Sequence, residues 1–161
     1  MAGKEPRAHR PAGFPPGYKV PESESGMKPW RWATDRLEAA RNYWLATTRP
    51  SGAPHAMPVW GLWLDGTVVF STAPDSVKAR NLDRDARAVI HVALGDDVVI
   101  LEGEVERIEL DAATADLYAA KYDYRPEPPG SADEGWYRFR PRAAYAWADD
   151  FPRSVTRFDL G

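Results

Sequence analysis

Short β-type runs separated by strong turn signals are the feature of this sequence that most constrains its fold. The runs are rich in β-branched and aromatic residues and span residues 43–48, 54–63, 67–72, 88–94 and 98–108. The turn signals between them are Arg49-Pro50-Ser51-Gly52, Asp65-Gly66 and Gly95-Asp96-Asp97. Connections this short join antiparallel neighbours, because parallel strands need a crossover of about a dozen residues or more. The pattern therefore predicts an antiparallel sheet.

Helical patterns are few and short, and they fall between the strands. Thr34 or Asp35 can cap a helix that runs to Asn42, and Asp111 or Thr114 can start another. Further β-type runs lie at residues 136–140, 143–148 and 154–158. Many short antiparallel strands with a few helices in the crossovers predict a mainly β protein, built as a small closed or nearly closed barrel.

The first 29 residues differ from the rest in composition. They are dense in proline, glycine and charge, so they bury too little apolar surface to fold alone. The chain has 161 residues, of which 43% are hydrophobic, and this suits one domain with a single core. We expect a flexible N-terminal arm over residues 1–29 and one β-barrel domain over residues 30–161.

Charge, cysteine content and hydropathy argue against several classes of function. A net charge of −3 is not that of a general nucleic-acid binder. Cysteine is absent, which removes disulfides and thiolate chemistry, and the three histidines are too scattered to predict a metal site. No window approaches the roughly 18 apolar residues of a membrane span, and the first residues lack the apolar stretch of a signal peptide. We therefore expect a cytoplasmic protein without metal, nucleic acid or membrane span.

Hydroxyl and basic residues gather where the run 67–72 ends and a short helical pattern begins. Ser71 and Thr72 end the run, and Ser76, Lys78 and Arg80 follow in the segment 76–82. Backbone N–H groups, hydroxyls and cations at one point are what a phosphate monoester requires. The same residues also fit an ordinary capped surface helix, with Ser76 as the N-cap. No glycine-rich phosphate loop is present, so neither a nucleoside triphosphate nor a Rossmann-bound dinucleotide is indicated.

An ordered set of short motifs surrounds this segment. The motifs are Tyr43-Trp44-Leu45-Ala46-Thr47, Gly52-x-Pro54-His55, Pro58-Val59-Trp60, Phe70-Ser71-Thr72, Ser76-x-Lys78-x-Arg80-Asn81-Leu82 and Leu101-Glu102-Gly103. In this order the set resembles the pyridoxamine 5'-phosphate oxidase-like flavin and deazaflavin oxidoreductases. The resemblance implies a six-stranded antiparallel split β-barrel and a homodimer, with one cofactor in each of two grooves at the subunit interface.

The resemblance also implies which residues hold the cofactor. Its phosphate would be bound by residues of the polar segment, namely Ser71, Thr72, Ser76, Lys78, Ala79, Arg80 and Asn81. Its ring would be lined by Pro58, Val59 and Trp60, with backbone amides that tune its hydride affinity. The hydride step needs no acid or base from the protein, so we assign no catalytic side chain. His55 lies close to the expected ring and either donates to a ligand or packs in the hairpin.

Three functions are compatible with this resemblance. The Lys-x-Arg-Asn-Leu pattern and the Arg-rich, Lys-poor composition favour coenzyme F420, in a reductase that transfers a hydride to a small unsaturated substrate. Lys28, Arg31, Arg36 and Arg41 could then provide a basic path for the acidic tail of F420. FMN is the alternative cofactor, in an oxidase or reductase, since the same phosphate-binding residues would serve F420 and FMN. A flavin- or haem-binding protein without turnover is the third. Residues 149–154 do not match the substrate motif of the true pyridoxamine phosphate oxidases, which argues against vitamin B6 oxidation.

Overall fold

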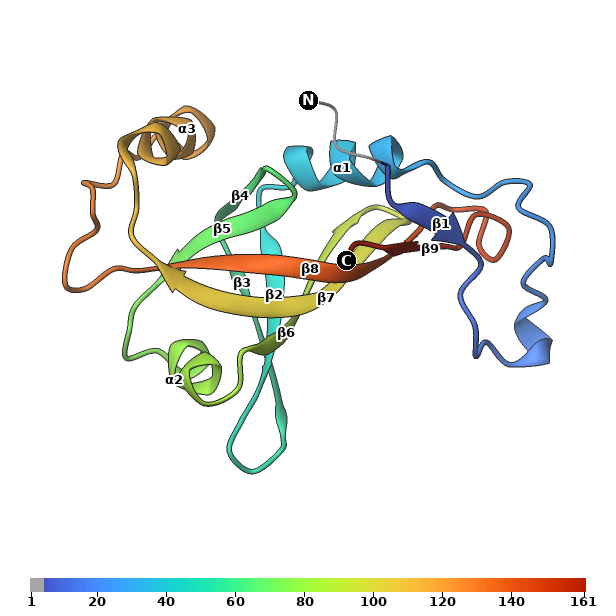
Figure 1. Cartoon of the computed structure of the whole chain (residues 1–161), viewed down its shortest axis with the longest axis horizontal. Coiled ribbons are helices and arrows are strands. Elements are labelled where there is room, and N and C mark those ends of the chain that lie inside the picture. Colours follow the sequence, from blue (N-terminus) through green and yellow to red (C-terminus); the bar gives the residue numbers. More distant parts are fainter. Residues whose placement is uncertain (1–4) are drawn as a thin grey trace.

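The computed structural model describes residues 5–161, which form a nine-stranded antiparallel sheet with a few short helices (Figure 1). The strands are β1 (Arg7–His9), β2 (Tyr43–Thr48), β3 (Pro54–Val59), β4 (Gly61–Leu64), β5 (Thr67–Thr72), β6 (Arg87–Leu94), β7 (Asp97–Ile108), β8 (Gly135–Trp147) and β9 (Thr156–Asp159). The helices are η1 (Pro16–Tyr18), α1 (Trp30–Ala39), α2 (Val77–Arg84) and α3 (Ala112–Tyr122). None of the helices within residues 5–161 has the length and apolar character that a membrane span requires.

Strand β8 joins the two parts of the sheet. It pairs with β7 along most of its length, with β5 through residues 135–139 and with β9 through residues 143–146. The sheet order is β1-β9-β8-β7-β6-β2-β3, and β4 is attached through β5. Because one long strand changes partner halfway along, the sheet divides into two curved parts. The predicted mainly β split barrel is therefore confirmed.

The strand count is higher than the six that the resemblance implied. The expected run 54–63 is interrupted at Trp60, so that β3 pairs with β2 while β4 pairs with β5. The runs expected at 136–140 and 143–148 instead form the single strand β8. Pro141 is tolerated within it because it lies opposite Gly103 beside a bulge in β8, where Arg142 has no partner in β7.

The first helix begins earlier than its capping residues indicated. It starts at Trp30, directly after the extended Pro29, and Thr34 lies inside it with its hydroxyl bonded to the carbonyl of Arg31. Ala33 and Leu37 lie four residues apart on the buried face, so the helix includes residue 33 and cannot begin at a cap at residue 34 or 35.

Residues 5–29 run beside the C-terminal strand. Strand β1 pairs with β9, and the guanidinium of Arg10 donates to the carbonyl oxygens of Ser23, Ser25, Arg153 and Val155. These bonds attach this segment to the connection between β8 and β9. Figure 1 shows it extending away from α2 and α3, at the opposite end of the molecule.

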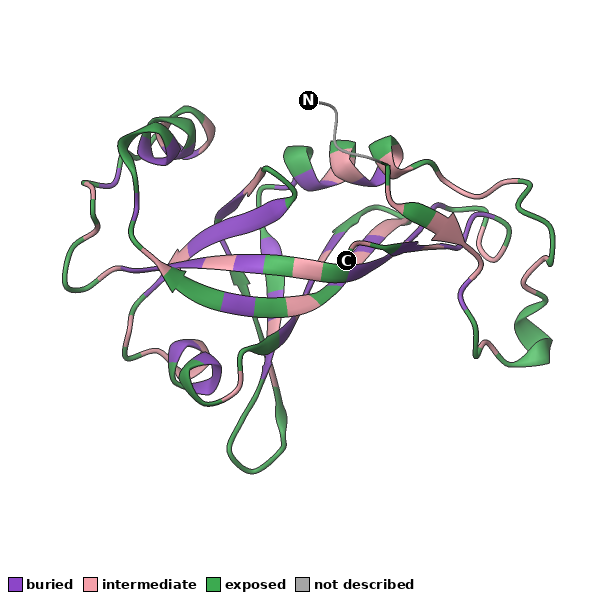
Figure 2. Ribbon diagram, in the orientation of Figure 1, coloured by how far each residue is buried: buried purple, intermediate pink, exposed green. Residues whose placement is uncertain are grey.

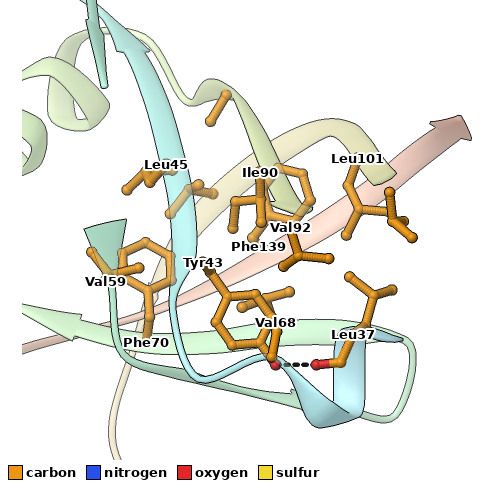
Figure 3. Packing of buried hydrophobic residues seen from close by; sticks show 14 of the residues in the cluster. Leu37, Tyr43, Leu45, Val59, Val68, Phe70, Ile90, Val92, Leu101 and Phe139 are labelled. Atoms are coloured by element: carbon orange, nitrogen blue, oxygen red, sulfur yellow. Dashed lines mark hydrogen bonds between the residues drawn. The ribbon is translucent and has the colours of Figure 1, made fainter. Parts of the chain in front are cut away.

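The core lies on the inner faces of the strands, where buried residues alternate with exposed ones (Figure 2). In β2, for example, Tyr43 and Leu45 are fully buried while Trp44 between them is 43% exposed. Phe70 and Phe139 fill the barrel from β5 and β8, as Figure 3 shows. The hydroxyl of Tyr43 donates to the carbonyl of Leu37 and so holds α1 over the core.

Candidate functional site

The polar segment predicted to bind phosphate lies where β5 leads into α2 (Figure 1). Ser76 is the N-cap of α2, because its Oγ accepts a hydrogen bond of 3.2 Å from the N–H of Ala79. Thr72, the last residue of β5, places its Oγ1 3.2 Å from the same oxygen. The capped-helix interpretation is therefore correct for Ser76, and this cap fixes the direction in which the first turn of α2 points.

The first turn of α2 also keeps unused donors. Within residues 5–161, the backbone N–H groups of Val77 and Lys78 donate to no protein acceptor. The side chain of Lys78 is half-buried, and this burial lowers the pKa of its amine. No carboxylate among the described residues lies close enough to compensate for this burial by raising the pKa of the amine. A partly desolvated amine beside free amides at a helix N-terminus is stabilised by a bound anion, so this turn fits a phosphate group.

His55 adds a further unsatisfied polar atom. It lies on β3 opposite Thr47 of β2, and its Nδ1 is buried without a hydrogen-bond partner among residues 5–161. Burial lowers the pKa of His55, and the positive charges of Arg49 and Lys78 lower it further. A negatively charged ligand between these groups would supply a hydrogen-bond partner for Nδ1 of His55 and would raise the pKa of this histidine again.

Three of the residues predicted to hold the phosphate have other contacts. Ala79 is fully buried, and the amide of the buried Asn81 donates to Oγ1 of Thr47 at 3.0 Å. Asn81 thus anchors α2 on β2 with its side chain directed into the protein. Arg80 is exposed and donates to the carbonyl of Asp75 at 2.6 Å, in the loop before the helix. The structure therefore places Lys78 in the first turn of α2, which the contact between Thr72 and Ser76 joins to the end of β5. The side chains of Ala79, Arg80 and Asn81 are used in packing or in hydrogen bonds within the protein.

Replacing Asn81 by alanine is expected to lower the free energy of unfolding by about 1–3 kcal/mol, because the buried hydroxyl of Thr47 loses its partner. Urea unfolding followed by circular dichroism measures the change. Asp83→Ala, at an exposed position of the same helix, is the control and should stay within about 0.5 kcal/mol of the parent protein. Equal stability of the two variants would contradict the anchoring role.

The three residues predicted to line a cofactor ring lie at the end of β3 and differ in exposure. Val59 is buried in the core near Phe70 (Figure 3), and Pro58 is exposed. Trp60, between β3 and β4, is 40% exposed. Its ring stacks on that of Tyr122 from α3, with 4.6 Å between centroids and 8° between planes. Of the three, Trp60 is the residue that offers an aromatic surface to a planar ligand.

The basic path expected for an acidic tail is partly used by internal ion pairs. Arg31 pairs with Asp35, and Arg36 pairs with Asp97. Arg41 instead lies 5.3 Å from the centroids of both the Trp60 and the Tyr122 rings. It therefore places a positive charge directly beside the candidate ring wall.

Sequence reasoning missed Tyr122 as part of this site. The helical period over residues 111–122 indicates that α3 packs on the protein, but no sequence signal connects residue 122 with residue 60. The contact between Tyr122 and Trp60 depends on how α3 packs against the sheet, which is a feature of the tertiary structure.

Comparison with known proteins identifies the family. Residues 33–148 match the family model described as Pyridoxamine 5'-phosphate oxidase. The chain belongs to this family, as the ordered motifs predicted. Because the family includes flavin oxidoreductases, membership supports an oxidoreductase in general. No curated protein sequence matches the chain significantly.

Solved structures give the same fold with modest identity. An F420 reductase is 26% identical, with a TM-score of 0.57, and the similarity covers 68% of this chain and 93% of that one. A haem-binding protein from Mycobacterium smegmatis is also 26% identical, with a TM-score of 0.58 over 77% of this chain and 55% of that one. A conserved hypothetical protein from Mycobacterium tuberculosis is 23% identical, with a TM-score of 0.65 over 78% of this chain and 88% of that one.

Proposed function

We propose that this protein is an F420-dependent reductase that transfers a hydride to a small unsaturated substrate. The observation that carries the proposal is the first turn of α2, where free amides and the unpaired Lys78 amine fit a phosphate group. Family membership supports a flavin-like cofactor, and the similarity to an F420 reductase favours deazaflavin over flavin.

The residues of the chain bind and orient the cofactor. Lys78 and the amides of Val77 and Lys78 hold the phosphate, while Ser76 keeps the turn in place. Trp60 forms one wall for the ring, and Arg41 beside it attracts the acidic tail. When bound, the deazaflavin supplies the hydride. His55 stays neutral near neutral pH, because its pKa is lowered, and so can donate or accept a hydrogen bond at the phosphate end.

The same proposal includes a homodimer formed through the outer face of the sheet. On this face Trp44 is 43% exposed and stacks on His91, with 6.3 Å between the centroids. A groove of about 710 Å³ opens nearby and is lined by residues of β2, β6 and β7, among them Ala46, Val89 and Glu102. A second copy of the chain would cover the exposed Trp44 and this groove, whose lining combines alanine and valine side chains with charged ones that suit pairing across a two-fold axis.

A fluorescence titration with F420 and with FMN tests the cofactor. We expect F420 to bind more tightly than FMN, and we expect the protein with reduced F420 to reduce members of a panel of conjugated carbonyl compounds. Micromolar affinity for FMN without binding of F420 would overturn the proposal in favour of an FMN-dependent oxidase or reductase. The same residues would then bind the phosphate of FMN.

The second candidate is a haem- or flavin-binding protein without turnover, which the similarity to a haem-binding protein favours. Addition of haemin followed by absorption spectroscopy separates the two. A stoichiometric Soret shift, together with no binding of F420 or FMN, would favour this candidate.

A further inference from the structure

The junction between β3 and β4 receives an unusual number of polar contacts from α3. The hydroxyl of Tyr122 accepts a hydrogen bond from the N–H of Gly61 at 2.9 Å. It lies 2.8 Å from the carbonyl oxygens of both Gly61 and Arg41, so it can donate to either one. The amine of Lys121 donates to the carbonyl of Gly61 at 2.9 Å and to the hydroxyl of Tyr43 at 3.2 Å. Both backbone polar groups of Gly61 are therefore held by one helix.

Gly61 is also enclosed on the barrel side. It pairs with Phe70 of β5, and a Cβ placed on Gly61 would lie 3.0 Å from the carbonyl oxygen of Val69 and 3.3 Å from the ring of Tyr43. A larger residue at position 61 would therefore be crowded, so the close approach of this junction to the barrel requires glycine. Because Trp60 directly precedes this fixed glycine, its backbone direction is set as well.

The side chain of Trp60 is fixed by the same helix. The ring of Tyr122 covers one face of the indole at a centroid distance of 4.6 Å and an interplanar angle of 8°. Since Trp60 remains 40% exposed, part of its surface stays open to solvent. An aromatic side chain that is supported on one face by a neighbouring ring and partly exposed, here with the guanidinium of Arg41 beside it, is a platform on which a planar ring can stack.

Lys121, which donates to the carbonyl of Gly61, holds a positive charge in a partly buried position, and this burial is unfavourable. Burial, together with the positive charge of Arg41, lowers the pKa of its amine to about 8. A lysine is rarely kept in such a place unless its hydrogen bonds serve a purpose. Here the bonds hold the carbonyl of Gly61 and so the residue next to the platform.

We propose that Tyr122 is a positioning residue that holds the indole of Trp60 as a stacking platform for a planar fused-ring heteroaromatic ligand. The inference rests on the proposed function for its ligand, since a deazaflavin or flavin ring belongs to this class. In this arrangement the C-terminal end of α3 determines how well the ring is bound, and the first turn of α2 determines how well the phosphate is bound.

The test separates ring from phosphate by using two probes, F420 and its phosphate-free deazaflavin chromophore. Tyr122→Leu should weaken the binding of both probes by about fivefold, because the support of Trp60 is lost. Tyr122→Phe keeps the stack but loses the bonds to Gly61 and should weaken both by about twofold. Tyr118→Phe is the matched control, since it removes a hydroxyl from the same helix that has no bond to another described residue, and it should leave both affinities unchanged.

A second readout does not depend on any cofactor. In protein labelled with 5-fluorotryptophan, the fluorine signal of Trp60, assigned with Trp60→Phe, should shift in Tyr122→Phe and not in Tyr118→Phe. This comparison stays informative if Tyr122→Leu fails to fold.

The outcomes distinguish the two proposals. If Lys78→Ala weakens F420 binding but both Tyr122 variants bind the chromophore like the parent protein, the platform is wrong and the proposed function stands. If the Tyr122 variants bind the chromophore more weakly than the parent protein while Lys78→Ala leaves the affinity for F420 unchanged, the phosphate assignment is wrong and the platform stands. An unchanged fluorine signal in Tyr122→Phe would also overturn the platform.

Discussion

Replacing Lys78 by alanine is expected to weaken F420 binding at least tenfold. The amine is half-buried, no described carboxylate neutralises it, and burial lowers its pKa, so the free protein holds a cation that lacks a counter-ion. A hydrogen bond between such a cation and a phosphate contributes about 1.5–3 kcal/mol, which corresponds to a tenfold change in dissociation constant or more. Fluorescence titration of the two proteins with F420 measures the difference.

Lys19→Ala is the matched control for this measurement. Lys19 follows η1 in the N-terminal segment, where it is exposed, and its removal changes the net charge by the same amount. The control should bind F420 like the parent protein. If the dissociation constant of Lys78→Ala for F420 stays within about twofold of that control, the phosphate does not lie at the first turn of α2 and the phosphate-binding residues are wrongly assigned.

Replacing Gly103 by alanine is expected to lower the free energy of unfolding by about 3 kcal/mol. A Cβ at this position would lie 2.1 Å from the carbonyl oxygen of Arg140 and 2.9 Å from the Cα of Pro141. Both atoms belong to the backbone of β8, so no side-chain rotation relieves the clash. The strand itself would have to move at the bulge where Glu102 and Gly103 change register.

Urea unfolding followed by tryptophan fluorescence measures this loss. Gly17→Ala is a suitable control, because nothing lies within 4 Å of a Cβ built at that position, and it should change stability by less than about 0.5 kcal/mol. A loss below about 1 kcal/mol for Gly103→Ala would mean that the bulge adapts to a methyl group.

The fold could be predicted from the sequence largely because its turns are local. Asp65 and Gly66 both adopt positive φ, at 49° and 74°, as the tight hairpin between β4 and β5 requires. Ser76 and Asp111 each accept a hydrogen bond from a backbone N–H in the first turn of the following helix, so both capping predictions are confirmed. These features are decided by neighbours within a few residues, and sequence patterns report such neighbours directly.

The break at Trp60 could not be predicted in the same way. The sequence of residues 54–63 is typical of one extended run, and nothing in the local pattern indicates that β3 and β4 pair with different strands. The break is stabilised by Tyr122 and Lys121, which lie far along the chain. A hydrogen bond between distant residues is set by the packing of whole elements and leaves no local signal.

The candidate site shows the same division. The position of Lys78 in the first turn of a helix could be predicted because this helix closely follows a strand end. The inward direction of Asn81 could not, since it depends on Thr47 of another strand. Similarly, Gly103 belongs to one of the ordered motifs, but the reason for a glycine there is the close approach of β8, which no local pattern indicates.

The shared strand β8 has a consequence for how the protein forms during synthesis. β5 and β7 are made before β8, yet each depends on β8 for a hydrogen-bonded neighbour. β1 likewise pairs with β9, which is made after all the other strands. Until residues 135–139 have left the ribosome, β5 therefore keeps an open edge that other chains can pair with. Slow translation through residues 110–135 would prolong that exposure, so the yield of folded protein should depend on how quickly this stretch is completed.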